Sequence, residues 1–166
     1  MRENELDVVN IRLVPDRTYF SDRPIRCPDD AIPFIAEHLA DYDREVLAVL
    51  NLNTKGKVIN LNFVSVGTIN ASLVEPREVF KSVVLSNASA LIMIHVHPSG
   101  DPTPSREDLA VTARIEKIAD LFGVHLLDHV IVGCGNPPVT YSFAEHDKMK
   151  KEPQKKTVSE RQGPSL

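Results

Sequence analysis

The residues best suited to chemistry lie within one short stretch, positions 94–109, which reads IHVHPSGDPTPSREDL. His95 and His97 are one residue apart, and along a β-strand this spacing places both imidazoles on the same face, with Val96 facing the other way. The Pro- and Gly-containing loop that follows can turn the chain back, so that Asp108 presents its carboxylate to the same point. Two imidazoles and one carboxylate form a ligand set of catalytic zinc sites, in which a fourth tetrahedral position is left for water. The sequence therefore predicts one zinc ion per chain, bound by His95, His97 and Asp108.

The same stretch also offers a hydroxyl group that could assist hydrolysis. A zinc ion lowers the pKa of its bound water from about 15.7 to about 7 and polarises a carbonyl oxygen, while a nearby carboxylate moves the proton. Ser105 could donate a hydrogen bond to the developing oxyanion, which is worth about 3 kcal/mol. Taken singly, the histidines could be hydrogen-bonded core residues, and Ser105 with Asp108 could be the capping pair of a helix. We favour the zinc site because a strand end, a rigid loop and a helix start bring all of them together.

A strand and a helix, on either side of the loop 98–104, must position these residues. Residues 90–94 form a short, continuous apolar segment, which is typical of a buried strand. His95 follows this segment directly. Ser105 is a favourable N-cap, and apolar residues then recur at helical spacing until Gly123, which can end a helix. The rest of the chain predicts helices over about 30–41 and 76–87 and strands over 8–14, 45–52, 57–66 and 126–132.

Composition indicates one globular domain followed by a basic tail. With 166 residues and 42% hydrophobic content, the chain has the size of a single core. Six of its 19 Lys and Arg residues lie in the last 20 positions, against three of its 23 Asp and Glu residues, so the body has a net charge of −7. Such a body binds phosphate backbones poorly. We therefore expect a domain over residues 1–146 and a flexible, disordered tail over 147–166, which alone could attach to nucleic acid.

Cysteine content and hydropathy predict a cytoplasmic protein without membrane association. Cys27 and Cys134 are too few and too far apart for a disulfide framework or a thiolate zinc site. No run approaches the roughly 18 apolar residues of a membrane-spanning helix. The first residues, MRENELDVVN, lack the layout of a signal peptide.

The chemical residues also match the signature of a known family. His95-x-His97, followed after seven residues by Ser105 and after two more by Asp108, resembles the signature of JAB/MPN (JAMM) metalloproteins. The phrases HVHPSGDPTPSREDL, PREVF, GTINASLV and LLDHVIVG resemble the RadC-like branch, and the resemblance covers about residues 30–145. It implies an α/β (α+β) domain of MPN/JAB type, with a mixed curved β-sheet flanked by helices. It also implies a bound zinc ion and the activity of a metallopeptidase-like hydrolase.

The resemblance further implies an upstream glutamate that hydrogen-bonds the zinc-bound water. Glu45 stands where the family has this glutamate, at the start of the apolar segment EVLAVL, and we assign it as the general base. Glu75 and Glu78 are the alternatives, and Glu78 fits better on the outer face of the helix begun by Pro76. If Glu45 is only an exposed charge at a strand end, Glu75 is the next choice.

Two positions depart from the family's usual pattern. Val96 replaces an asparagine, and it is expected to alter the surroundings of the metal without removing a ligand, because its side chain points away. Glu75 stands where histidine or tyrosine is commoner and adds negative charge near the loop. Among the other histidines, His129 is expected to form a buried structural contact with Asp128. His38, His125 and His146 are expected to be solvated or at an edge.

The leading functional prediction is a metallopeptidase or isopeptidase that hydrolyses a peptide-like amide, with Glu45 passing the proton to the leaving amine. A small amide or carbamoyl compound is an alternative substrate, because the surrounding loops carry no readable specificity. The alternative function is that of an accessory protein in DNA repair, recombination or mobile-element maintenance, with a binding or structural zinc. Family members without catalysis typically lose these ligands, which favours the enzyme.

Overall fold

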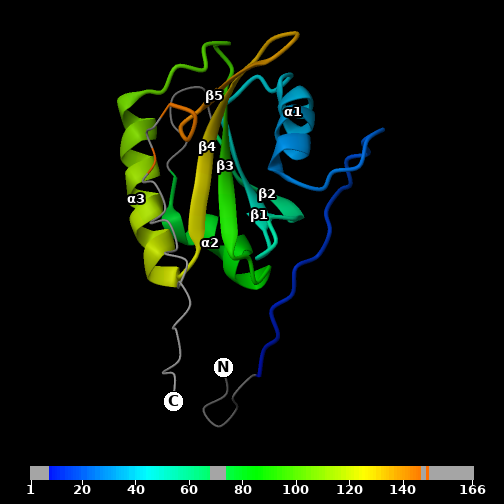
Figure 1. Ribbon diagram of the computed structural model, residues 1–166, viewed down its shortest axis with the longest axis vertical. Coiled ribbons are helices and arrows are strands. Elements are labelled where there is room, and N and C mark those ends of the chain that lie inside the picture. Colours follow the sequence, from blue (N-terminus) through cyan, green and yellow to red (C-terminus); the bar gives the residue numbers. More distant parts are fainter. Residues whose placement is uncertain (1–7, 68–73, 147–148, 150–166) are drawn as a thin grey trace, which may run out of the picture.

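The computed structural model describes residues 8–67, 74–146 and 149, which form a five-stranded mixed sheet with helices on both faces (Figure 1). The strands are β1 (Val46–Leu52), β2 (Val58–Val66), β3 (Ala90–His97), β4 (His125–Gly133) and β5 (Val139–Ser142), in the spatial order β2-β1-β3-β4-β5. The helices are α1 (Pro28–Leu39), α2 (Pro76–Leu85) and α3 (Arg106–Phe122). Helix α1 covers one face, and α2 and α3 pack against the other. The predicted α/β class, a single domain with a mixed sheet flanked by helices, is confirmed.

Strand β3 lies at the centre of the sheet, with an antiparallel neighbour on one side and a parallel neighbour on the other. Strand β1 pairs antiparallel with both β2 and β3, while β3 and β4 run parallel. A parallel pair needs a crossover connection, and α3 provides it. All of β1 is buried, and so is β3 up to its last residue, which accounts for their nearly continuous apolar sequences.

Alternate residues of β3 enter two separate cores. Ile94 and Val96 pack with α1, whereas Met93 packs with α2 and α3. His95 and His97 follow Met93 at two-residue intervals, so their side chains leave the sheet on the α3 side. Val96 is fully buried in the α1 core. The prediction that Val96 faces away from the two histidines is confirmed.

The sequence-based outline is wrong about one strand and misses another. Residues 8–14 form no strand, and their apolar side chains stay exposed, 91% for Val8 and 82% for Val14. Their composition favours a strand, but a strand needs a neighbour, and no described strand pairs with this segment. Strand β5 pairs antiparallel with β4, although its four residues, VTYS, have too little apolar character to predict it.

Three predictions stay untested by the fold. None of the described helices is both long and apolar enough to cross a membrane, and a cytoplasmic location stays a prediction. The predicted tail, 147–166, lies outside the described residues except for position 149. Its flexibility and the domain boundary at 146 therefore stay predictions too.

Candidate metal centre

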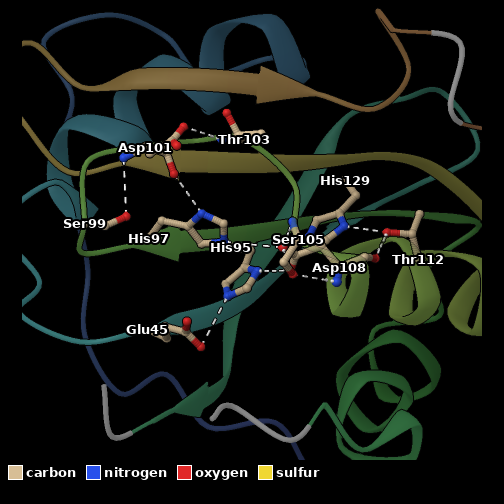
Figure 2. Close-up of polar contacts among 10 residues, drawn as sticks. All are labelled: Glu45, His95, His97, Ser99, Asp101, Thr103, Ser105, Asp108, Thr112 and His129. Carbon is tan, nitrogen blue, oxygen red and sulfur yellow. Dashed lines mark hydrogen bonds and ion pairs between the residues drawn. The ribbon is translucent and has the colours of Figure 1, made fainter. Parts of the chain in front are cut away.

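The three predicted ligands meet at one end of the sheet, where β3 ends and α3 begins (Figure 2). The rings of His95 and His97 lie edge to face, with centroids 4.7 Å apart. Asp108, in the first turn of α3, reaches both of them. Its Oδ1 is 2.8 Å from His95 Nδ1, and its Oδ2 is 3.5 Å from His97 Nε2. The fold thus places two imidazoles from β3 beside one carboxylate from α3.

Helix α3 begins with a capping box that fixes the Asp108 carboxylate. Ser105 Oγ accepts a hydrogen bond from the Asp108 backbone N–H at 3.0 Å. In return, Asp108 Oδ2 accepts from the Ser105 backbone N–H at 2.8 Å and from its hydroxyl at 2.5 Å. Capping boxes satisfy free N–H groups at a helix start, and here the same bonds leave Asp108 Oδ1 facing His95. The Ser105 proton is directed at Asp108 in this arrangement, so the oxyanion role of Ser105 stays a prediction.

A backbone carbonyl determines which nitrogen of His97 can bind a metal. Nδ1 of His97 lies 2.9 Å from the carbonyl oxygen of Asp101. A carbonyl oxygen only accepts, so Nδ1 donates, and in the neutral ring Nε2 carries the lone pair. Metal-binding histidines typically have this arrangement, with the second nitrogen bonded to a carbonyl or a carboxylate. His97 therefore offers Nε2 on the side of Asp108.

Asp108 concentrates negative charge in the metal-free site. Burial by itself raises the pKa of Asp108, but contacts with His95, His97 and Ser105 outweigh burial and hold that pKa well below its usual value. The hydrogen bond to Asp108, in turn, raises the pKa of His97. The site is therefore suited to hold positive charge, which either a proton on His97 or a divalent ion can supply.

Glu45 reaches the site through the register of β1 and β3. The two strands are antiparallel with Leu47 opposite His95, so Glu45, two residues earlier, lies on the same face beside the end of β3. Its Oε2 is 3.9 Å from His95 Nε2, and its side chain is 27% exposed, so it borders solvent. The alternative Glu78 instead forms an ion pair within α2, and Glu75 occupies the N-cap position of α2.

The structure adds a histidine that the sequence does not predict as part of the site. Possible ligand atoms of His95, Asp108 and His129, all buried, lie within 4.8 Å of one another. The expected contact of His129 with Asp128 is present, but through the His129 backbone N–H, at 2.7 Å. The ring contacts Thr112 Oγ1 instead, at 2.7 Å. Strand alternation could have shown only that the His129 ring does not face the Asp128 side chain, because neighbouring residues of a strand point to opposite faces.

The hydrogen bonding of two ring nitrogens bears on whether these residues suit a metal ion. His95 Nε2 and His129 Nε2 are buried and have no hydrogen-bond partner among the described residues. A buried polar atom without a partner costs about 1–3 kcal/mol. Imidazoles beside a carboxylate are the donors that zinc prefers, so the residues present fit this ion. The other histidines, His38, His125 and His146, are exposed, as predicted.

The loop 98–104 packs closely against β4 at a pair of glycines. Gly133 lies opposite His97 in the β3–β4 register, and a Cβ on Gly133 would overlap the carbonyl oxygen of Gly100 and lie 2.8 Å from its carbonyl carbon. We therefore expect Gly133→Ala to displace the loop, to lower the free energy of unfolding by about 1–3 kcal/mol and to weaken zinc binding. Urea denaturation and zinc titration measure the two effects.

Gly56→Ala is the matched control for this substitution. Gly56 has a positive φ of 70°, and a Cβ there meets no atom within 4 Å. Alanine at this turn should therefore cost stability through backbone strain and leave zinc affinity unchanged. Equal zinc affinity in the Gly56 and Gly133 variants would show that the close approach does not position the site.

His129 should make the metal-free protein sensitive to acid. Burial lowers the pKa of His129 to about 3, below the usual histidine value of about 6.5. The unfolded chain therefore takes up this proton at a higher pH than the folded chain, so the associated stability is present above about pH 6.5 and declines toward pH 3. We expect the free energy of unfolding to fall by about 1 kcal/mol per pH unit within this window because of His129. Urea denaturation at several pH values measures the slope, which should flatten in His129→Asn; equal slopes would contradict the assignment.

Comparison with known proteins shows which family the chain belongs to. A family model described as the RadC-like JAB domain matches residues 25–149, which include the whole sheet and the predicted ligands. A UPF0758 protein of Desulforamulus reducens is 47% identical over 109 residues, or 66% of this chain and 48% of the relative. One of Geobacillus thermodenitrificans is 45% identical over 115 residues, or 69% of this chain and 51% of the relative. The chain thus spans about half the length of the curated relatives it matches. It belongs to the RadC-like JAB domain family.

Proposed function

We propose that this chain is a zinc-dependent hydrolase of the JAMM type that cleaves an amide or isopeptide bond, with the ion held by His95, His97 and Asp108. The observation that best supports the proposal is the Asp108 carboxylate, which lies 2.8 Å from one imidazole and 3.5 Å from the other. When bound, zinc supplies an activated water and polarises the substrate carbonyl. Membership of a JAB domain family adds support, because JAB/MPN domains include hydrolases.

Glu45 is the general base in this proposal. Its carboxylate lies 3.9 Å from His95 Nε2, and the Glu45 side chain is 27% exposed, so solvent reaches it. A carboxylate there can accept a proton from the attacking water and deliver it to the leaving amine. The same group thus serves as base in the first step and as acid in the second.

Ser105 has two roles in the proposal. Through its backbone N–H and its hydroxyl it holds Asp108 Oδ2, and this contact orients the carboxylate toward the histidines. Its hydroxyl is also the donor that we assign to the developing oxyanion, once a bound ion competes for the Asp108 oxygens.

A peptide-like substrate suits the charge of the domain better than a nucleic acid does. Residues 1–146 carry a net charge of −7, which disfavours a phosphate backbone. A small amide or carbamoyl compound needs the same chemistry and stays the alternative substrate. Because the chain spans about half of its relatives' length, substrate selection and partners in the longer proteins are likewise proposals.

Metal-dependent cleavage tests the proposed activity. Purified protein is incubated with fluorogenic peptide amides and Lys-linked isopeptides before chelation, after chelation and after zinc is added back. We expect cleavage to disappear on chelation and to return with about one equivalent of zinc, because water needs the ion to become nucleophilic at neutral pH. Cleavage that persists both after chelation and in Asp108→Ala would exclude this mechanism.

A second function, as an accessory in DNA repair or recombination with a structural zinc, is supported by the basic tail. Positions 147–166 carry six Lys and Arg residues against three acidic ones. Binding through phosphate contacts weakens as salt rises. Salt-sensitive DNA binding that is lost when 147–166 are removed would support this function, and unchanged binding by the truncated protein would remove the support.

A further inference from the structure

The hydrogen bonds around Thr112 determine which nitrogen of His129 carries a proton (Figure 2). Thr112 Oγ1 lies 2.6 Å from the backbone carbonyl oxygen of Asp108 and 2.7 Å from His129 Nδ1. The carbonyl only accepts, so the single Thr112 hydroxyl proton is donated to Asp108. His129 Nδ1 must then donate to Thr112 Oγ1, and Nε2 of the neutral ring carries an unshared electron pair.

Among the residues that the structure describes, no donor lies within hydrogen-bond distance of that electron pair. His129 is buried, and its Nε2 has no hydrogen-bond partner among the described residues. The ring is held in place by stacking on Phe143, with centroids 4.8 Å apart, and on His95, with centroids 6.0 Å apart and planes 11° apart. A rigid, buried acceptor without a donor is uncommon in folded proteins, and such an atom is suited to bind an ion or a water molecule.

His129 shares a bonding pattern with His97. In both rings Nδ1 is engaged, by a carbonyl in His97 and by a hydroxyl in His129, and Nε2 is left as the donor atom for a metal. One possible ligand atom from each of His95, Asp108 and His129, a ring nitrogen or a carboxylate oxygen, lies within 4.8 Å of the other two. We propose that His129 binds the divalent ion through Nε2, so that His95 and Asp108 belong to two overlapping ligand sets. One set is completed by His97 near the surface and the other by His129 in the interior.

The inference rests on the proposed function only in requiring that a divalent ion binds His95 and Asp108. The inner set, completed by His129, is wholly buried, whereas the His97 side chain keeps 13% of its surface exposed. Loss of His97 should therefore weaken ion binding without abolishing it, and loss of both His97 and His129 should abolish it.

Zinc affinity, measured by competition with a chromophoric chelator, tests the inference together with the absorption spectrum of the Co²⁺-substituted protein. The variants are His97→Ala, His129→Asn, the double variant and Thr112→Val. Asparagine can still donate to Thr112 but lacks an atom in place of Nε2, whereas valine at 112 leaves Nε2 intact. Circular dichroism checks that each variant is folded.

We expect His97→Ala to retain one equivalent of zinc at reduced affinity, with an altered Co²⁺ spectrum. His129→Asn should bind zinc at least about 10-fold more weakly than Thr112→Val, and the double variant should bind none. Wild-type affinity in His129→Asn, or complete loss of binding in His97→Ala, would overturn the inference. The His97→Ala result stands even if His129→Asn fails to fold. Failure of the proposed hydrolysis is distinguishable, because it would show as no zinc-dependent cleavage by a protein whose zinc affinity still falls in His129→Asn.

Discussion

His95→Ala and Asp108→Ala are each expected to bind zinc at least about 100-fold more weakly than the wild type. Changes to residues that merely orient metal ligands already cost 10- to 100-fold in affinity, so loss of a ligand itself costs more. Asp108 lies within 3.5 Å of both predicted histidine ligands, and His95 Nδ1 is 2.8 Å from Asp108 Oδ1. Both residues belong to each of the two ligand sets, so neither His97 nor His129 can compensate for their loss. Zinc content after dialysis, measured by atomic emission, gives the result.

Two further variants separate metal binding from folding. Asp108→Asn keeps an oxygen that can accept from the Ser105 N–H, so it preserves most of the helix cap while removing the charge. His38→Ala removes an exposed histidine from α1 and should leave zinc content unchanged. Because a ligand that binds only the folded state raises stability, added zinc should raise the melting temperature of His38→Ala but not of the Asp108 variants. An equal zinc content in the wild type and in the His95, Asp108 and His38 variants would show that His95 and Asp108 are not ligands.

Glu45→Gln should separate metal binding from catalysis. Glutamine has nearly the same shape as glutamate but cannot accept the proton, so kcat should fall by about 10²- to 10⁴-fold while zinc content stays at the wild-type level. Glu45 Oε2 lies 3.9 Å from His95 Nε2, and Glu45 is not one of the three proposed ligands. Single-turnover cleavage of a fluorogenic isopeptide, with metal analysis of the same sample, measures both quantities.

The two rejected glutamates serve as controls for this assignment. Glu78 forms an ion pair with Lys81 at 2.6 Å on the exposed face of α2, so Glu78→Gln should leave kcat unchanged. Glu75→Gln should likewise keep its activity. Loss of cleavage in Glu75→Gln with full cleavage in Glu45→Gln would reverse the assignment of the base.

Local signals in the sequence were sufficient for the elements that carry the ligands. The capping pair Ser105 and Asp108, helical spacing and Gly123 define α3, whose cap has the predicted bonds and whose C-cap glycine has a φ of 67°. Alternation along β3 correctly places Val96 on the face opposite His95. Each of these features depends only on residues close together in the chain.

Features that depend on pairing between distant segments could not be predicted in the same way. Residues 8–14 have a strand-like composition, but whether a strand forms depends on a free neighbour elsewhere in the sheet. His129 joins the site because β4 lies parallel to β3 with His129 opposite Met93, and because α3 brings Thr112 over it. The spacing of residues along the chain contains neither that register nor that contact. The assignment of Glu45 to the site followed from family resemblance. The β1–β3 register explains physically why Glu45 lies beside His95.

The central claim is that the end of β3 and the first turn of α3 share one divalent ion that keeps an open position for water. A crystal structure of the zinc-loaded protein, with anomalous scattering recorded at the zinc edge, tests it most directly. We predict a single peak at bonding distance, about 2.0–2.2 Å, from Asp108, His95 and one further imidazole, with water at a remaining position. A peak away from Asp108, or an ion enclosed by four protein side chains, would contradict the account.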